Sequence, residues 1–243
     1  MLNKNNFTED LTYNLLTILT DVKNMFYGEN RFKVACYDTP KNNNNENQAV
    51  NEPIINAKTL KINDLMDKVK LCRKCLLSET RTQTVFGSGN FDSKVMIIGE
   101  APGYDEDKQG FPFVGKAGQL LDKMLKAIDL TRDDVFICNI LKCRPPNNRN
   151  PNDDEIKNCT SYLNEQINLI NPKIIFTLGN FATQFILKDN RGITQLRGKT
   201  YNLDNRIILP TFHPSALLQN QNLKRPAWHD LKLLKLLLKK VNN

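Results

Sequence analysis

The fold class predicted for this 243-residue chain is α/β, built around a central four-stranded parallel sheet. The first observation behind this prediction is a set of short apolar runs bounded by glycine, proline or polar residues, which is typical of buried strands. These runs are residues 95–98, 135–141, 173–179 and 206–212. The second observation is that segments with helical spacing of apolar residues separate the runs. Strands that alternate with helices indicate a doubly wound, parallel arrangement.

The first part of the chain differs in composition from the rest. Within residues 1–40, apolar side chains recur at helical spacing, so we expect an N-terminal helical extension. Residues 41–58 begin with a polar, asparagine-rich stretch of low complexity, which predicts a disordered linker. Residues 59–243 are then expected to form the folded domain.

Helices are expected around and between the four strands of this domain. Asn152, followed by three acidic residues, is a suitable N-cap for one of them. The expected helices are residues 59–71, 115–130, 153–170, a segment ending near residue 187, and 227–241. Residues 104–108, which carry three acidic side chains, are expected to form a loop after the first strand.

The chain is basic, with a net charge of +8, and the excess of lysine and arginine lies in the folded domain. A basic domain suits a polyanionic partner such as nucleic acid, although ordinary solubility charge explains the composition equally well. Runs of 18 apolar residues are absent, so we expect no membrane span. The N-terminus lacks the pattern of a secretory signal, and we expect a cytoplasmic monomer.

Polar residues follow three of the predicted strands. Glu100 lies just beyond the first strand, Asn139 falls near the end of the second, and His213 follows the fourth. The carboxyl ends of parallel strands lie on one edge of a sheet, where α/β proteins bind their ligands. We therefore expect these three side chains to meet in one cleft.

Four of the six cysteines form a pattern that suggests a metal or cluster site. Cys72 and Cys75 make a CxxC pair, and Cys143 and Cys159 could complete a four-thiolate set. Such a set suits either an iron–sulfur cluster or structural zinc, and spacing alone does not separate them. A redox-active CxxC is less favoured because no strand precedes Cys72. Cys138 is interpreted as a small core residue.

Four motifs together resemble the family 4 uracil-DNA glycosylases, the iron–sulfur branch of the uracil-DNA glycosylase superfamily. The motifs are GEAPG at 99–103, PFVGKAG at 112–118, NILKCRPPNNRNP at 139–151 and HPSALL at 213–218. The four cysteines also fall in the order typical of this family. The resemblance covers residues 65–241 and leaves the N-terminal segment without an interpretation.

The resemblance implies a three-layer α/β/α sandwich, a [4Fe-4S] cluster and hydrolysis of the N-glycosidic bond of deoxyuridine in DNA. It implies that Cys72, Cys75, Cys143 and Cys159 hold the cluster. Gly99, Phe113 and Asn139 would bind the substrate: Phe113 would stack on uracil and Asn139 would read its Watson–Crick edge. His213 would face the leaving base.

The group that activates water is less clear from the motifs. The best-known branch of the superfamily has an aspartate in the first motif, where this chain has Ala101. The available carboxylates are those of Glu100, Asp105, Glu106 and Asp107. Glu100 and Glu106 are the candidates for catalysis, and Glu106 fits the position where this family usually keeps an acid. Asp105 is better explained as part of a solvated turn. A carboxylate near the sugar could also stabilise the oxocarbenium ion without taking a proton.

Each of these residues also has a purely structural explanation. Phe113 could be a core residue, and the Asn139 amide could be paired with nearby backbone. His213 could simply end a strand. The alternative functions are a DNA-binding module without catalysis and a redox iron–sulfur protein. Retention of Glu100, Phe113, Asn139 and His213 together favours an enzyme, because neither alternative needs this set.

Residues near the expected cleft are candidates for contacts with DNA. Phosphate contacts are expected from the basic side chains Lys142, Arg144, Arg149 and Arg197. Leu217 and Leu218 follow the HPSA sequence and could wedge into the base stack that uracil leaves. Core packing of one of these leucines is an equally good explanation.

Overall fold

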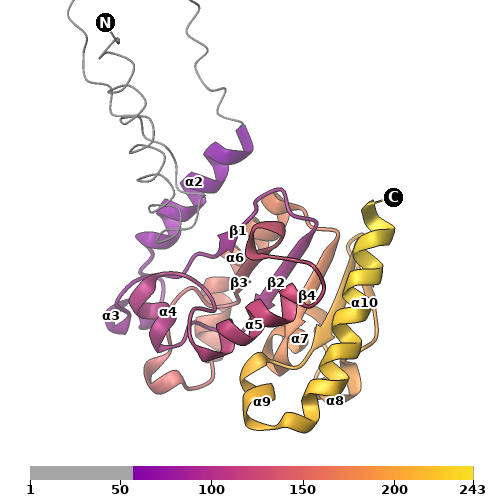
Figure 1. Cartoon of the computed structure of the whole chain (residues 1–243). Coiled ribbons are helices and arrows are strands. Elements are labelled where there is room, and N and C mark those ends of the chain that lie inside the picture. Colours follow the sequence, from indigo (N-terminus) through magenta and orange to yellow (C-terminus); the bar gives the residue numbers. More distant parts are fainter. Residues whose placement is uncertain (1–56, 243) are drawn as a thin grey trace, which may run out of the picture. The chain divides into compact units, whose positions relative to one another are not determined.

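The computed structural model describes residues 57–242, which form an α/β body with a mixed six-stranded sheet (Figure 1). The strand order is β1-β3-β2-β4-β6-β5. The extension predicted for residues 1–40 lies outside the described residues, as does the predicted linker up to residue 56. Helix α2 (Ala57–Lys70) begins two residues before the predicted start of the domain.

The four central strands are parallel, as the sequence predicts. They are β3 (Phe136–Asn139), β2 (Val95–Gly99), β4 (Ile174–Leu178) and β6 (Arg206–Thr211). Two strands that the sequence did not predict, β1 (Ser88–Gly89) and β5 (Tyr201–Leu203), add an antiparallel strand at each edge. Both edge strands are short and partly exposed, so they lack the continuous apolar run that marks a central strand.

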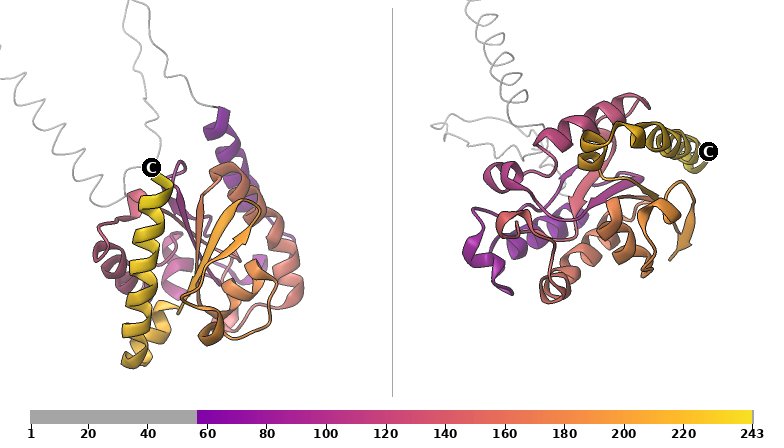
Figure 2. Two further views of the ribbon diagram at one scale, coloured as in Figure 1. Left: turned by 90° about the vertical axis from the view of Figure 1, so that its right-hand side faces the viewer. Right: turned by 90° about the horizontal axis from the view of Figure 1, so that it is seen from below.

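Helices cover both faces of the sheet, and every residue of β2, β3 and β4 is buried (Figure 2). One face packs against α2, α6 (Asp153–Ile170) and α7 (Gly179–Leu187) through residues such as Leu65, Leu163 and Ala182. The other face packs against α5 (Lys116–Lys126), α9 (Pro214–Gln219) and α10 (Lys224–Asn242). This arrangement is the three-layer sandwich that the resemblance implies.

The predicted helices are present with shifted ends, and one segment predicted as a loop is helical. The Asn152 N-cap is confirmed: its backbone N–H donates to Glu155 Oε2 at 2.9 Å, closing a capping box. The segment expected as an acidic loop is instead the short helix α4 (Tyr104–Gln109), which Gly110 ends in the left-handed conformation. The remaining short helices are α3 (Leu77–Thr80), α8 (Ile193–Leu196) and the 3-10 turns η1 (Arg132–Asp134), η2 (Pro146–Asn148) and η3 (Gln221–Leu223).

The strand register brings the sequence motifs to one edge of the sheet. Gly99 at the end of β2 lies opposite Asn139 at the end of β3. Strand β6 ends at Thr211, two residues before His213, which caps α9. Among residues 57–242, no helix combines the length and the apolar character that crossing a bilayer requires.

Candidate uracil-binding pocket and thiol cavity

Gly99, Phe113 and Asn139 converge at the carboxyl end of the sheet. A Cβ atom placed on Gly99 would lie 2.4 Å from Asn139 Oδ1 and 2.6 Å from Phe113 Cζ. Both distances are far below van der Waals contact, so only glycine fits between the amide and the ring. The three residues that the sequence predicts to bind substrate are therefore brought together.

Asn139 presents a buried acceptor that the protein leaves unused. The residue is 2% exposed, and within the described part of the chain Oδ1 accepts no hydrogen bond. Leaving a buried acceptor unpaired costs about 1–3 kcal/mol, so native proteins rarely do this without a reason. The simplest reason is a ligand that brings its own donor into the pocket.

Phe113 is held in a conformation that a phenylalanine rarely adopts. Its φ of 55° is left-handed, which is uncommon for a bulky residue. Arg132 donates to the carbonyl oxygens of Pro112, at 2.9 Å, and of Phe113. Gly118 allows the Phe113 carbonyl to approach closely, because a Cβ there would lie 1.7 Å from its oxygen. The ring is thereby fixed beside Asn139.

Glu106 braces the same loop from α4. Its Oε1 accepts hydrogen bonds from the backbone N–H groups of Val114, at 2.9 Å, and Gly115, at 3.0 Å. Its Oε2 accepts from the N–H of Gly103 at 3.1 Å. These three donors occupy the carboxylate of Glu106, the residue that the sequence motif suggests as a possible catalytic acid.

Glu100 differs from Glu106 in having no partner. Within residues 57–242 no hydrogen bond or ion pair reaches its carboxylate, and burial raises the pKa of the Glu100 carboxyl above its ordinary value. Asp107 is committed elsewhere, because it accepts the Thr82 N–H at 2.9 Å with one oxygen and at 3.1 Å with the other. Glu100, which follows Gly99 in the sequence, thus has a carboxylate with free acceptor positions.

His213 faces Phe113, with ring centroids 5.6 Å apart and planes inclined by 35°. The Ser215 backbone N–H donates to His213 Nδ1 at 3.2 Å, and the Ser215 hydroxyl oxygen lies 2.7 Å from the same atom. A backbone N–H can only donate, so Nδ1 is an acceptor and the neutral ring carries its proton on Nε2. Burial lowers the pKa of His213 to about 4, which keeps the ring neutral at pH 7.

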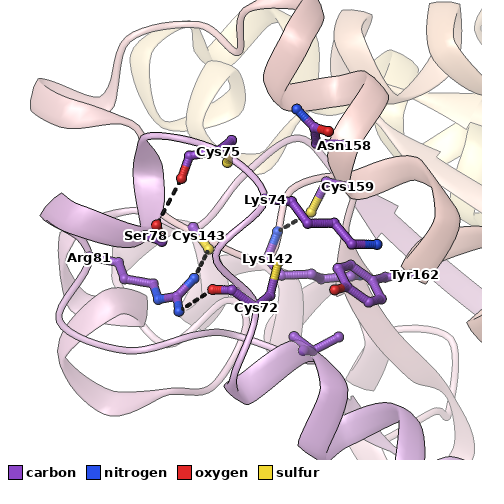
Figure 3. Close-up of a pocket in the computed structure, with 11 residues that line it drawn as sticks. Cys72, Lys74, Cys75, Ser78, Arg81, Lys142, Cys143, Asn158, Cys159 and Tyr162 are labelled. Atoms are coloured by element: carbon purple, nitrogen blue, oxygen red, sulfur yellow. Dashed lines mark hydrogen bonds between the residues drawn. The ribbon is translucent and has the colours of Figure 1, made fainter.

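The four predicted cluster ligands line a single cavity. Cys72, Cys75, Cys143 and Cys159 surround it from three segments of the chain (Figure 3). Arg81 approaches from α3's end: Nη1 donates to Cys143 Sγ at 3.1 Å and Nη2 donates to the Cys72 carbonyl at 2.6 Å. Cys138 instead lies buried in β3, as expected for a core residue.

The donor set around the cavity consists of four thiols, the ligand type of both structural zinc and iron–sulfur clusters. Zinc holds thiolates at about 2.3 Å, so its ligands must converge on one point. Between residues 57 and 242, no group of three or more His, Cys, Asp or Glu side chains is placed to hold one metal ion. Four thiols around a cavity are the ligand type that a larger iron–sulfur cluster takes.

Burial alone disfavours thiolates in this cavity. It raises the pKa of Cys143 to about 11, although the Arg81 guanidinium opposes the shift, and it also raises the pKa of Cys159. Nearby cations and a bound metal both favour the thiolate. The sequence pattern found the four thiols, but no local signal marked Arg81, which contacts them from outside the motifs.

Three of the four basic residues expected to bind phosphate are engaged within the protein. Lys142 is buried, Arg149 pairs with Glu155 at 2.6 Å, and Arg197 pairs with the buried Asp230. Arg144 keeps a partly exposed guanidinium, which donates to Asn148 Oδ1 at 2.7 Å and lies 5.1 Å from the centre of the Tyr104 ring. The simple expectation of a row of free phosphate contacts is therefore wrong for Lys142 and Arg197.

The two candidate wedge residues are separated by the structure. Leu217 is packed in the core that contains α5 and α10. Leu218 is 42% exposed on α9, next to the pocket segment that carries His213. Of the two, only Leu218 is free to enter a base stack.

Comparisons with known proteins agree with this geometry. The family model for the uracil DNA glycosylase superfamily matches residues 86–232. The type-4 uracil-DNA glycosylase of Sulfurisphaera tokodaii is 46% identical over 185 residues, covering 71% of this chain and 84% of that protein. The corresponding protein of Thermotoga maritima is 43% identical, covering 72% of this chain and 93% of its own length.

More distant relatives match part of this chain in sequence. A type-5 uracil-DNA glycosylase of Pyrobaculum aerophilum is 32% identical over 149 residues. A DNA polymerase of Bacillus phage SP01 is 33% identical over 163 residues, which make up 18% of that polymerase. With similarity that covers 84% and 93% of the two type-4 enzymes, and with the motif residues gathered in one pocket, this chain belongs to the type-4 branch of the uracil-DNA glycosylase superfamily.

Proposed function

We propose that this protein removes uracil from DNA by hydrolysing the N-glycosidic bond and leaving an abasic site. The observation that carries the proposal is the unpaired, buried Asn139 Oδ1 beside the constrained Phe113 ring. A base inside a duplex cannot reach such a pocket, so the uracil must first be flipped out of the stack. Leu218, exposed beside His213, is suited to fill the space that the base leaves.

Uracil matches the pocket in its hydrogen-bonding pattern. Asn139 Oδ1 would accept the uracil N3–H, and the amide nitrogen would donate to O4. Cytosine presents an acceptor at N3 and a donor at N4, so it would leave the amide mispaired. Stacking on Phe113 would add about 1–3 kcal/mol without distinguishing the bases. Asn139 therefore supplies specificity and Phe113 supplies affinity.

His213 would stabilise the leaving group. Cleavage of the bond develops negative charge on uracil, and a neutral imidazole with its proton on Nε2 can donate to O2. A single donor of this kind is worth about 2.7–4 kcal/mol in the transition state. The ring enters the reaction already neutral, because its pKa is about 4.

Between the two candidate acids, we assign the catalytic role to Glu100. Its carboxylate has no partner within residues 57–242, so it could orient the attacking water or stabilise positive charge on the sugar. Glu106 accepts three backbone N–H groups, which favours a positioning role for it. It would act by holding the loop that carries Phe113.

Cys72, Cys75, Cys143 and Cys159 would hold a [4Fe-4S] cluster in the thiol cavity. Bound there, such a cluster would tie the segment before α3 to Cys143 after β3 and to Cys159 in α6. Uracil-containing DNA is the proposed partner, with Arg144 as a phosphate contact. A cytoplasmic monomer remains the prediction made from the sequence.

The proposal is tested with a labelled oligonucleotide that contains one uracil. We expect an abasic site, revealed by alkaline strand cleavage, with wild-type protein and at least a hundredfold slower single-turnover cleavage with His213→Ala. The matched control is His229→Ala, which removes the other histidine of the chain. Binding of the oligonucleotide without excision would instead support a non-catalytic DNA-binding module.

A further inference from the structure

Lys142 connects the proposed uracil pocket to the thiol cavity. Its side chain is 1% exposed, and Nζ donates to the Asn139 backbone carbonyl at 2.6 Å. Its own backbone N–H donates to Cys159 Sγ at 3.3 Å, and the residue lines the thiol cavity (Figure 3). One residue thus contacts a proposed cluster ligand and the residue proposed to read uracil.

The Lys142 ammonium has no carboxylate partner in the described part of the chain. None of the ion pairs between residues 57 and 242 includes it, and its one hydrogen bond is to a neutral carbonyl. A buried charge is costly unless an opposite charge compensates it. Lys142 lines the same cavity as the four cysteine thiols proposed to hold the cluster. Thiolates that ligate a cluster would therefore supply the missing negative charge.

The same ammonium restricts Asn139. Lys142 Nζ binds the Asn139 carbonyl, and strand β2 pairs with Asn139 from the other side through Gly99. Because its backbone is held on both sides, Asn139 directs its side-chain amide into the space that the missing side chain of Gly99 leaves beside the Phe113 ring. A change in the position of the ammonium would be transmitted to this amide through a single hydrogen bond.

We propose that Lys142 is a positioning residue that links the cluster to uracil recognition; this inference rests on the proposed function. The negatively charged cluster environment holds the buried ammonium, and the ammonium holds the Asn139 backbone in the orientation that reads uracil. This assigns the thiol site a role in a reaction that transfers no electrons. It also explains why a lysine in the NILKC sequence points inward instead of toward DNA.

The test compares substitutions at three cations that line the cavity. Lys142→Met removes the charge and the hydrogen bond, whereas Lys142→Gln removes the charge and keeps a donor. Lys74→Met is the matched control, because Lys74 lines the same cavity but is exposed. Arg81→Gln is a second control, since Arg81 contacts Cys143 but has no bond to the uracil pocket.

Each protein is prepared anaerobically and measured for iron content, for the midpoint potential of the cluster, and for single-turnover excision. Removing a nearby positive charge disfavours the reduced cluster, so both Lys142 variants are expected to shift the potential to more negative values. Lys142→Met should also slow uracil excision by about 10–100-fold, the usual effect of losing a residue that supports a metal ligand. Lys142→Gln should slow it less.

The controls separate this proposal from a general loss of the cluster. Arg81→Gln should shift the potential while excision by iron-loaded protein stays near wild type, and Lys74→Met should change neither. An unchanged potential in both Lys142 variants, or wild-type excision by iron-loaded Lys142→Met, overturns the proposal. If Lys142→Met and Lys142→Gln both fail to fold, Lys142→Arg is made as well. A folded Lys142→Arg protein supports the requirement for a positive charge, and an unfolded one counts against the proposal. Absence of excision by wild-type protein would overturn the proposed function but not the measured shift in potential.

Discussion

At the scale of single residues, the pocket depends on an absent side chain at Gly99 and, within residues 57–242, an absent hydrogen-bond donor to Asn139. Gly99 lacks the side chain that would separate Asn139 from Phe113, and Asn139 Oδ1 lacks a protein donor. His213 has one nitrogen occupied by Ser215, which leaves the other to carry the proton toward a ligand. These properties are the ones on which we base the proposal of a site for a flat base with an N–H between two carbonyls.

Substitution of Gly99 tests the space between the amide and the ring. In Gly99→Ala the methyl group would overlap Asn139 Oδ1 and Phe113 Cζ, so one of them must move. If stacking on Phe113 is lost, about 1–3 kcal/mol of binding is lost, which corresponds to a roughly 5- to 150-fold drop in kcat/KM for uracil DNA. The control is Gly192→Ala, where a Cβ would meet only Thr194 Oγ1, at 3.8 Å. Equal kcat/KM in the two variants would contradict the proposed pocket.

The pKa of His213 predicts how stability depends on pH. The folded-state value of about 4 lies below the ordinary 6.5, so between these values the unfolded chain binds more protons. The stability contributed by neutral His213 is therefore complete above about pH 6.5 and is lost as pH falls toward about 4. Urea unfolding of wild type and His213→Gln should differ in slope against pH within this window and run parallel above it. Parallel curves throughout would show that the ring titrates normally.

At the scale of elements, the loop between α4 and α5 is the part of the pocket under most constraint. A left-handed conformation at Phe113 costs on the order of 1–3 kcal/mol, so the surrounding contacts must maintain it. Glu106 from α4 and Arg132 from η1 supply them by binding backbone groups on both sides of the ring. Helix α4 therefore has a positioning role in addition to its place in the fold.

Substitution of Arg132 tests this constraint. Arg132→Gln removes donors to the carbonyls of Pro112 and Phe113, so the loop can relax and the ring can leave its stacking position. We expect KM for uracil DNA to rise at least about tenfold, because a charged hydrogen bond contributes about 1.5–3 kcal/mol. Asp122→Asn is the control: it removes the 2.7 Å ion pair of Arg132 but leaves the carbonyl contacts. That exposed pair should contribute at most about 1 kcal/mol. Similar KM values for both variants would show that the clamp is unimportant.

At the scale of the whole molecule, segments distant in sequence meet at two sites, the thiol cavity and the pocket. The thiol cavity joins the start of the domain to α6, and the pocket joins the ends of β2, β3 and β6. Lys142 lies between the two sites. The cavity and the pocket are therefore neighbours in one body, although their residues come from most of its length.

The cysteines test whether the cavity is a structural centre. Cys143→Ser removes one proposed ligand, and we expect loss of iron, loss of the brown colour and a lower midpoint of thermal unfolding. Cys138→Ser makes the same change five residues earlier, in the buried core of β3, and should retain iron and colour. Metal analysis and visible spectra of anaerobically purified proteins check this. Colourless wild-type protein loaded with zinc would contradict the choice of a cluster.

Much of this architecture was readable from the sequence, because it depends on local patterns. Continuous apolar runs identified the four central strands, since a strand covered on both faces must be apolar throughout. The strand-end positions of Glu100, Asn139 and His213 predicted their common edge, and the order of the cysteines, together with the family motifs, predicted the four thiols of one cavity. The short edge strands and α4 were missed, because neither carries a long or regular enough pattern.

Only the tertiary structure decided which charged residues are available. Lys142, Arg149 and Arg197 are basic residues suited to phosphate contacts, but the Asn139 carbonyl, Glu155 and the sequence-distant Asp230 engage them in the folded chain. The Arg132 clamp and the unpaired Asn139 oxygen likewise arise from contacts between distant segments. Runs of apolar residues, and the alternation of strand segments with helical ones, recur along the chain and are therefore visible in the local sequence. A hydrogen bond or ion pair depends on where one partner lies in space, and no local pattern records that position.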